Sequence, residues 1–186
     1  MSLRHAVLAA LLPGEASGYD LAKLFRASVG NFWVATPQQL YRELERLDED
    51  GLIAGHVVEQ QRRPNKRVYS LTRAGRAELA EYTREPARDT FIKDGLLVKV
   101  QAVDVGDQPA VRQALQARIE QSRARLSGYE ALRDRMLDGA SEPDYLASAP
   151  AIGPYLTLLR GLRFESENIE WAKEALEVLE RRFPAG

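Results

Sequence analysis

A run of cationic side chains occupies the stretch from residue 60 to residue 76. This stretch contains no Asp or Glu, although the whole chain of 186 residues has a net charge of −1. A local positive patch on a near-neutral chain indicates contact with a polyanion at one surface. A solvated loop accounts for the charge equally well, so the neighbouring residues have to decide between the two. The cationic residues are Arg62, Arg63, Lys66, Arg67, Arg73 and Arg76.

A second group of polar side chains precedes this patch and follows a helical period. Thr36 can cap a helix, Pro37 suits its first position, and Gln39 completes a capping box. Leucines at positions 40, 44 and 47 then mark one buried face. Away from that face lie side chains that can hydrogen-bond base edges or phosphates in a major groove. These candidate DNA contacts are Thr36, Gln38, Gln39, Tyr41, Arg42 and Arg46.

The acidic end of this helix does not contradict a DNA-reading role. Asp48, Glu49 and Asp50 follow the last leucine. In a helix that enters the groove with its N-terminus first, these carboxylates point away from the DNA. An ordinary amphipathic surface helix would show the same pattern, so the helix alone leaves both readings open.

Catalytic chemistry finds no support in the residue types. Cysteine is absent and there are only two histidines, which excludes thiol catalysis, disulfides and a histidine-rich metal site. No glycine-rich phosphate loop, nucleophile elbow or metal-spaced histidine pair occurs. We therefore expect no enzymatic activity and no cofactor.

The elements around the cationic patch predict a winged helix-turn-helix. Three helices come first, over about residues 3–12, 17–29 and 36–50. Two short strands rich in Val and Tyr follow at 53–60 and 67–71, joined by a polar turn, and a further helix runs from 72 to about 84. The strand connection is the candidate wing, which would hold DNA through phosphate or minor-groove contacts. Its candidate DNA contacts are Arg62, Arg63, Asn65, Lys66 and Arg67.

The second half of the chain predicts a helical dimerisation domain. Helices are expected at 90–100, 111–137 and 155–182, with a proline-containing loop at 139–154. The last helix carries a heptad stripe with one polar interruption at Glu165, and a second apolar stripe beside it. One stripe can pack on the preceding helix, so the other needs a partner, which we expect to be a second copy. Phe164 and Trp171 could instead line a ligand pocket. The candidate interface or pocket residues are Leu158, Leu162, Phe164, Ile169, Trp171, Leu176 and Leu179.

The sequence resembles the PadR family of bacterial transcription regulators. The resemblance rests on residues 12–20 (LPGEASGYD), 36–41 (TPQQLY), 44–52 (LERLDEDGL) and 63–72 (RPNKRVYSLT), in this order and spacing. Residues 93–99 (KDGLLVK) and the long last helix resemble, more loosely, the larger C-terminal domain of one branch of that family. The resemblance implies a homodimeric DNA-binding repressor that a small ligand releases from its operator.

These observations together predict a mainly α-helical chain with a small β-hairpin wing. Residues 1–85 would form the winged helix-turn-helix and residues 86–186 the helical dimerisation domain, with a possible ligand site. A homodimer implies a pseudo-palindromic operator in double-stranded DNA. The inducer would be a small apolar or aromatic molecule. Because no apolar run reaches the length of a membrane helix, we expect a cytoplasmic protein without a membrane partner. A winged helix that binds another protein, with an incidental basic loop, is the alternative.

Overall fold

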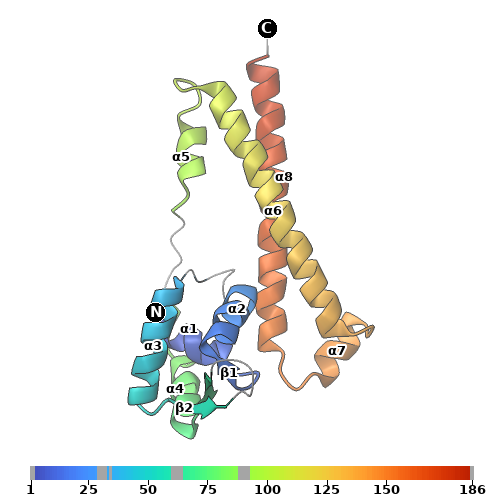
Figure 1. Cartoon of the computed structure of the whole chain (residues 1–186). Helices are drawn as coiled ribbons and strands as arrows, with labels where there is room; N and C mark the ends of the chain where they lie inside the picture. The colour runs from blue at the N-terminus through green and yellow to red at the C-terminus, as the bar shows by residue number, and fades with distance from the viewer. Residues whose placement is uncertain (1–2, 29–32, 34, 60–64, 88–92, 185–186) are drawn as a thin grey trace. The chain divides into compact units, whose positions relative to one another are not determined.

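A computed structural model describes residues 3–28, 33, 35–59, 65–87 and 93–184 of the chain. It divides the chain into two compact units, residues 1–89 and 90–186. In unit 1 the order is α1 (Leu3–Ala10), β1 (Ala16–Ser17), α2 (Gly18–Ser28), α3 (Pro37–Glu49), β2 (Ile53–Val58), β3 (Lys66–Leu71) and α4 (Arg73–Tyr82). In unit 2 it is α5 (Gly95–Gln101), α6 (Gln108–Leu137), α7 (Glu142–Ser148) and α8 (Gly153–Arg182). Figure 1 labels most of these elements.

Unit 1 is a three-helix core with a small sheet, as the sequence predicts. The leucine period of α3 is buried as predicted, with Leu40, Leu44 and Leu47 no more than 3% exposed. They pack with apolar residues of α1 and α2 in one cluster, which includes Leu8 and Phe25. The cluster fixes the face that α3 turns to the core, and therefore also the face that it turns to solvent.

The sheet has three antiparallel strands in the order β1-β3-β2. The pairing of β2 with β3 confirms the hairpin, with Gly55 opposite Tyr69 and Val57 opposite Arg67. The third strand, β1, was not predicted. It has only two residues, too few to show an alternating pattern, and it forms because Ala16 and Ser17 pair with Tyr69 and Val68.

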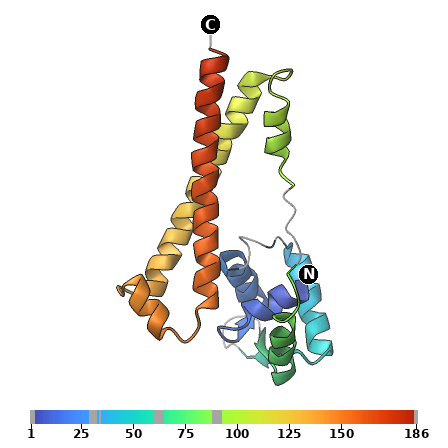
Figure 2. The same ribbon diagram turned by 180° about the vertical axis from the view of Figure 1, so that it is seen from behind.

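Unit 2 is built on two long helices, α6 and α8, that run antiparallel and cross (Figures 1 and 2). The predicted heptad stripe of α8 faces α6, and Ile169 and Ala172 are buried in one cluster with Leu115 and Ile119. α5 adds Leu96 to the same cluster. Within the described part of the chain, none of these helices combines the length and apolar character needed to cross a bilayer.

Several boundaries in unit 2 differ from the sequence prediction. α5 begins at Gly95 instead of residue 90, because Asp94 caps it by accepting a hydrogen bond from the N–H of Leu96. α6 begins at Gln108 instead of Val111, because Asp107 caps it by accepting a hydrogen bond from the N–H of Ala110 at 3.0 Å. The predicted loop at 139–154 contains the seven-residue helix α7. Ser141 caps α7 by accepting from the N–H of Asp144 at 3.3 Å. The prolines were interpreted as breaks, yet a proline in the first turn of a helix lacks only an N–H that would be unbonded anyway.

Candidate nucleic-acid interface

All six predicted DNA-contacting side chains are exposed: Thr36 caps α3, Gln38, Gln39, Tyr41 and Arg42 lie in its N-terminal half, and Arg46 lies in its last turn. The capping box at its start is present: Thr36 Oγ1 accepts from the N–H of Gln39 at 3.2 Å, and Gln39 Oε1 accepts from the N–H of Thr36 at 2.8 Å. These bonds occupy acceptor atoms. The Thr36 hydroxyl and the Gln39 amide therefore keep their donors for a ligand. Donors at the start of a helix are suited to phosphate and to purine acceptor atoms.

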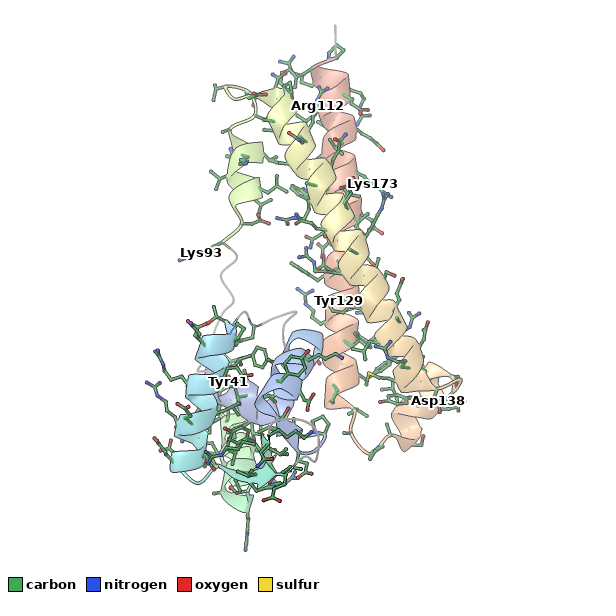
Figure 3. The ribbon with its side chains drawn as sticks, in the orientation of Figure 1. Tyr41, Lys93, Arg112, Tyr129, Asp138 and Lys173 are labelled. Carbon is green, nitrogen blue, oxygen red and sulfur yellow. The ribbon has the colours of Figure 1, made fainter. Side chains whose placement is uncertain are left out.

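Tyr41 combines a packing contact with an exposed surface. Its side chain is 45% exposed, and its ring lies against Gly18 at the start of α2. A Cβ on Gly18 would come within 2.5 Å of the ring, so only glycine permits this approach. Figure 3 shows Tyr41 on the side of α3 that faces α2. The contact limits the rotamers of Tyr41 while leaving part of the ring in solvent.

The charges along α3 are mixed, although its first turn contains no acidic residue. Arg42 is exposed near the N-terminal end. Arg46 is 63% exposed and lies 3.9 Å from the half-buried Glu43. At the opposite end the acids are engaged by other elements. Asp50 is paired with Arg4 of α1 at 2.8 Å, and Asp48 contacts both β2 and β3. Asp48, Glu49 and Asp50 thus lie at the C-terminal end of α3 as predicted, but Arg46 lies in the same last turn, so positive and negative side chains separate only in part.

The wing is described at the start of β3 only. Asn65, Lys66 and Arg67 are exposed there. Lys66 lies 3.9 Å from Asp20 of α2, whereas Arg67 is in direct contact with Asp48. Arg62 and Arg63 lie outside the described residues.

Two polar residues near these side chains were not singled out as candidate contacts. Tyr19 follows Gly18 and is 73% exposed. Asp48 was placed among the acids that point away from DNA, and nothing in the local sequence indicates its bonds to the two strands. Burial raises the pKa of Tyr69 in β3, and the neighbouring Arg67 guanidinium opposes that shift.

The candidate interface residues of α8 divide into two sets. Leu158, Leu162, Ile169 and Leu179 are buried within the single chain. Phe164, Trp171 and Leu176 are half-buried, so part of each side chain remains exposed in the single chain. Trp171 also packs on the α6–α8 cluster, and Arg160 lies 5.2 Å from the centre of the Phe164 ring.

A cavity of about 360 Å³ lies between α5 and α6, away from Phe164 and Trp171. Leu96, Ala114 and Ala117 give it apolar walls, and Lys99 and Arg118 are its basic lining residues, of which Arg118 is paired with Asp94 at 2.8 Å. Among the described residues, no group of three His, Asp or Glu side chains is arranged to hold a metal ion.

Comparison with known proteins finds a matching family model for each half of the chain. A model of the transcriptional regulator PadR-like family matches residues 7–81, and a model of the virulence activator alpha C-terminal region matches residues 92–180. The probable transcriptional regulator Rv1176c of Mycobacterium tuberculosis is 33% identical, with 98% of this chain and 100% of that protein covered. The negative transcriptional regulator PadR of Bacillus subtilis is 27% identical, with 96% and 98% covered.

Solved structures agree with this assignment. Bacillus subtilis PadR in complex with operator DNA has a TM-score of 0.75 at 27% identity, covering 95% of this chain and 98% of that one. The same protein in complex with p-coumaric acid has a TM-score of 0.69 at 26% identity, covering 96% and 95%. The Vibrio cholerae virulence activator AphA has a TM-score of 0.69 at 32% identity, covering 97% and 99%. Sequence and fold therefore lead to one conclusion: this chain is a transcriptional regulator, not an enzyme, and belongs to the PadR-like family.

Proposed function

We propose that this regulator is a homodimeric repressor that binds a pseudo-palindromic operator and is released by a small ligand. The observation that carries the proposal is the exposed face of α3. It presents hydrogen-bond donors at the start of the helix and two arginines, Arg42 and Arg46, while the opposite face is buried in the core. Such a helix can enter a major groove with its N-terminus first. The proposal also implies a cytoplasmic location, where bacterial operators lie.

Residues 1–85 would read the DNA with two sets of side chains. Thr36, Gln38, Gln39, Tyr41, Arg42 and Arg46 would contact base edges and nearby phosphates. Arg62, Arg63, Asn65 and Lys66 of the wing would contact the flanking backbone and supply much of the salt dependence. The operator complex of the relative PadR supports this assignment by analogy of fold.

Residues 86–186 would join two copies. α8 keeps Phe164, Trp171 and Leu176 half-buried, and Leu156 and Val178 of the same helix are about half exposed. Together they leave apolar surface for a partner helix, and two-fold symmetry would space two α3 helices for two half-sites. Light scattering should give twice the monomer mass of 20.8 kDa.

The complex of the relative PadR with p-coumaric acid supports a ligand site in this regulator. A ligand can release the operator only if it binds one spacing of the two α3 helices more tightly than the other. Repression is supported by the relative PadR of Bacillus subtilis, which is a negative transcriptional regulator. A reporter fused to the regulated promoter should lose activity when the regulator is expressed, and a gain would indicate activation instead.

Fluorescence anisotropy with a labelled duplex from the upstream region of the regulator's own gene tests the proposal. A scrambled duplex of equal length, at two salt concentrations, is the control. We expect tight, salt-sensitive binding that favours the native duplex, and weaker binding by Tyr41→Ala and Arg42→Ala. Equal binding of both duplexes, or no binding by a folded dimer, would contradict the proposal. Addition of p-coumaric acid then tests release.

A further inference from the structure

The carboxylate of Asp48 joins the C-terminal turn of α3 to both strands of the wing. Its Oδ1 accepts a hydrogen bond from the N–H of Gly55 in β2 at 2.9 Å. Its Oδ2 accepts from the guanidinium of Arg67 in β3. The Asp48 side chain is only 20% exposed. One side chain of the candidate recognition helix is therefore bonded to two different strands.

Arg67 is held in this arrangement by its surroundings. Its guanidinium lies 5.6 Å from the centre of the Tyr69 ring, within the range of a cation–π contact. Gly55 lies opposite Tyr69 in the hairpin, and a Cβ there would come within 2.6 Å of Arg67 Nε and 3.0 Å of the ring. Glycine at position 55 thus leaves the space that Arg67 occupies. The hairpin register brings all of these groups together.

The contacts of Arg67 bear on what it can do for DNA. The Arg67 side chain is 53% exposed, so its other N–H groups can reach solvent, but a phosphate that pulled the guanidinium away from Asp48 would leave the partly buried carboxylate without its charged partner. By comparison, Lys66 lies 3.9 Å from a half-exposed Asp20, which leaves its ammonium group freer to turn to a phosphate.

We propose that Asp48 is a positioning residue for DNA binding. Through Arg67 and the N–H of Gly55 it fixes the angle between the recognition helix and the wing, and Arg67 acts in this contact and not on a DNA phosphate. This inference rests on the proposed function. A helix in the major groove and a wing on the flanking backbone must bind at the same time. Fixing them relative to each other beforehand removes the entropy cost of ordering them on the DNA.

Three variants separate the positioning role from a direct contact: Asp48→Asn, Arg67→Gln and the double variant. Glu49→Gln is the matched control, because Glu49 is an exposed acid next to Asp48 on the same helix. Binding of each folded variant to the upstream duplex and to the scrambled duplex is measured by anisotropy over a series of salt concentrations. Circular dichroism melting checks the fold of each variant.

A positioning role predicts non-additive losses. Each single variant should lose about tenfold in affinity for the upstream duplex, and the double variant should lose no more than either single one. The slope of log affinity against log salt should stay that of the parent, because no phosphate contact is removed. Binding to the scrambled duplex should change little, which a general loss of folded protein would not produce. The control should bind like the parent.

A direct contact predicts the opposite pattern. Arg67→Gln would then lower the salt slope by roughly 0.9. Asp48→Asn would free the guanidinium and tighten binding to both duplexes. The double variant would then bind more weakly than Asp48→Asn. Either result overturns the inference, and so does parent-like affinity of Arg67→Gln. If the parent itself does not distinguish the two duplexes, the proposed function fails instead, and the two failures are thus separable.

Discussion

Each unit of this regulator contains a carboxylate paired with an arginine, and the two pairs differ in burial. Asp48 in unit 1 is 20% exposed and has both oxygens bonded. Glu165 in unit 2 is 6% exposed and is paired with Arg125 of α6 at 2.8 Å. Its second oxygen, Oε2, is buried without a hydrogen-bond partner among the described residues. An arginine–carboxylate pair therefore joins α3 to the strands of the wing in unit 1, and another lies between α6 and α8 in unit 2.

The surroundings of Glu165 extend this difference. Ser122 of α6 is fully buried, and within the described part of the chain its hydroxyl also has no hydrogen-bond partner. Burial raises the pKa of Tyr129, and the Glu165 carboxylate raises it further; Figure 3 labels this residue on α6. A polar layer inside an apolar helix pair costs stability but disfavours shifted registers. If Asp48 acts as proposed, its pair with Arg67 mainly fixes the geometry of unit 1, whereas the more buried carboxylate of Glu165 mainly affects the stability of unit 2.

The largest effect is expected from breaking the pair of Arg125 and Glu165. Arg125→Ala leaves a charged carboxylate inside the α6–α8 contact and should cost about 3 kcal/mol of unfolding free energy. Glu165→Leu is the matched control. It places an apolar side chain in the heptad stripe, and the half-exposed Arg125 can turn to solvent, so its stability should stay within about 1 kcal/mol of the parent. Urea denaturation measures both. Equal losses would mean that the attraction between the charges outweighs the cost of burying them.

The next effect sharpens the role of the exposed face of α3. Gly18→Ala should displace the Tyr41 ring, because its Cβ would come within 2.5 Å of that ring. We expect about a tenfold loss of operator affinity, on the scale of one specific contact. Gly128→Ala in α6, where a Cβ has open space, should leave DNA binding unchanged and add up to about 1 kcal/mol of stability. Anisotropy and thermal melting follow the two variants. Parent-like affinity of Gly18→Ala would remove Tyr41 from the DNA contacts.

A smaller effect concerns the cap that one long helix provides for the other. The guanidinium of Arg112 donates to the carbonyl oxygen of Leu179 at 2.9 Å and to that of Phe183, at the C-terminal end of α8 (Figure 3). Arg112→Ala removes the donor to the Phe183 carbonyl and one of the two donors to the Leu179 carbonyl, which keeps its bond from the N–H of Phe183, and should cost about 1.5 kcal/mol. Arg123→Ala, an exposed arginine of the same helix, should cost less than about 0.5 kcal/mol. Similar losses for both variants in urea denaturation would contradict the capping role.

The smallest effect depends on pH. Hydrogen bonds from Arg118, at 2.8 and 3.0 Å, lower the pKa of Asp94, which also caps α5. Because the pKa is lower in the folded state, this carboxylate stabilises the protein above its unfolded pKa. The contribution is lost below about pH 4, as pH falls through the folded pKa. Asp94→Asn should cost about 1 kcal/mol at pH 7, and the difference from the parent should shrink in acid. A difference that persists at low pH would contradict this assignment.

Local sequence patterns predicted α3 and its capping box well, because each signal lies within one turn or one helix. The capping box needs only Thr36 and Gln39, and the buried face of α3 needs only three leucines at helical spacing. The stripe of α8 was predicted for the same reason. The errors have local causes too. β1 is too short to show a period, and a proline near the start of α7 was interpreted as a break.

The sequence by itself determined the longer helices, the hairpin and the exposed polar face of α3, because side-chain periodicity and caps act between residues close in the chain. Only the tertiary structure decided which of the charged residues are bonded to one another. Asp48 and Arg67 meet across 19 positions through the hairpin register, and Arg125 and Glu165 meet because α8 returns along α6. Such contacts depend on how separate elements pack, and no pattern within either element encodes its partner.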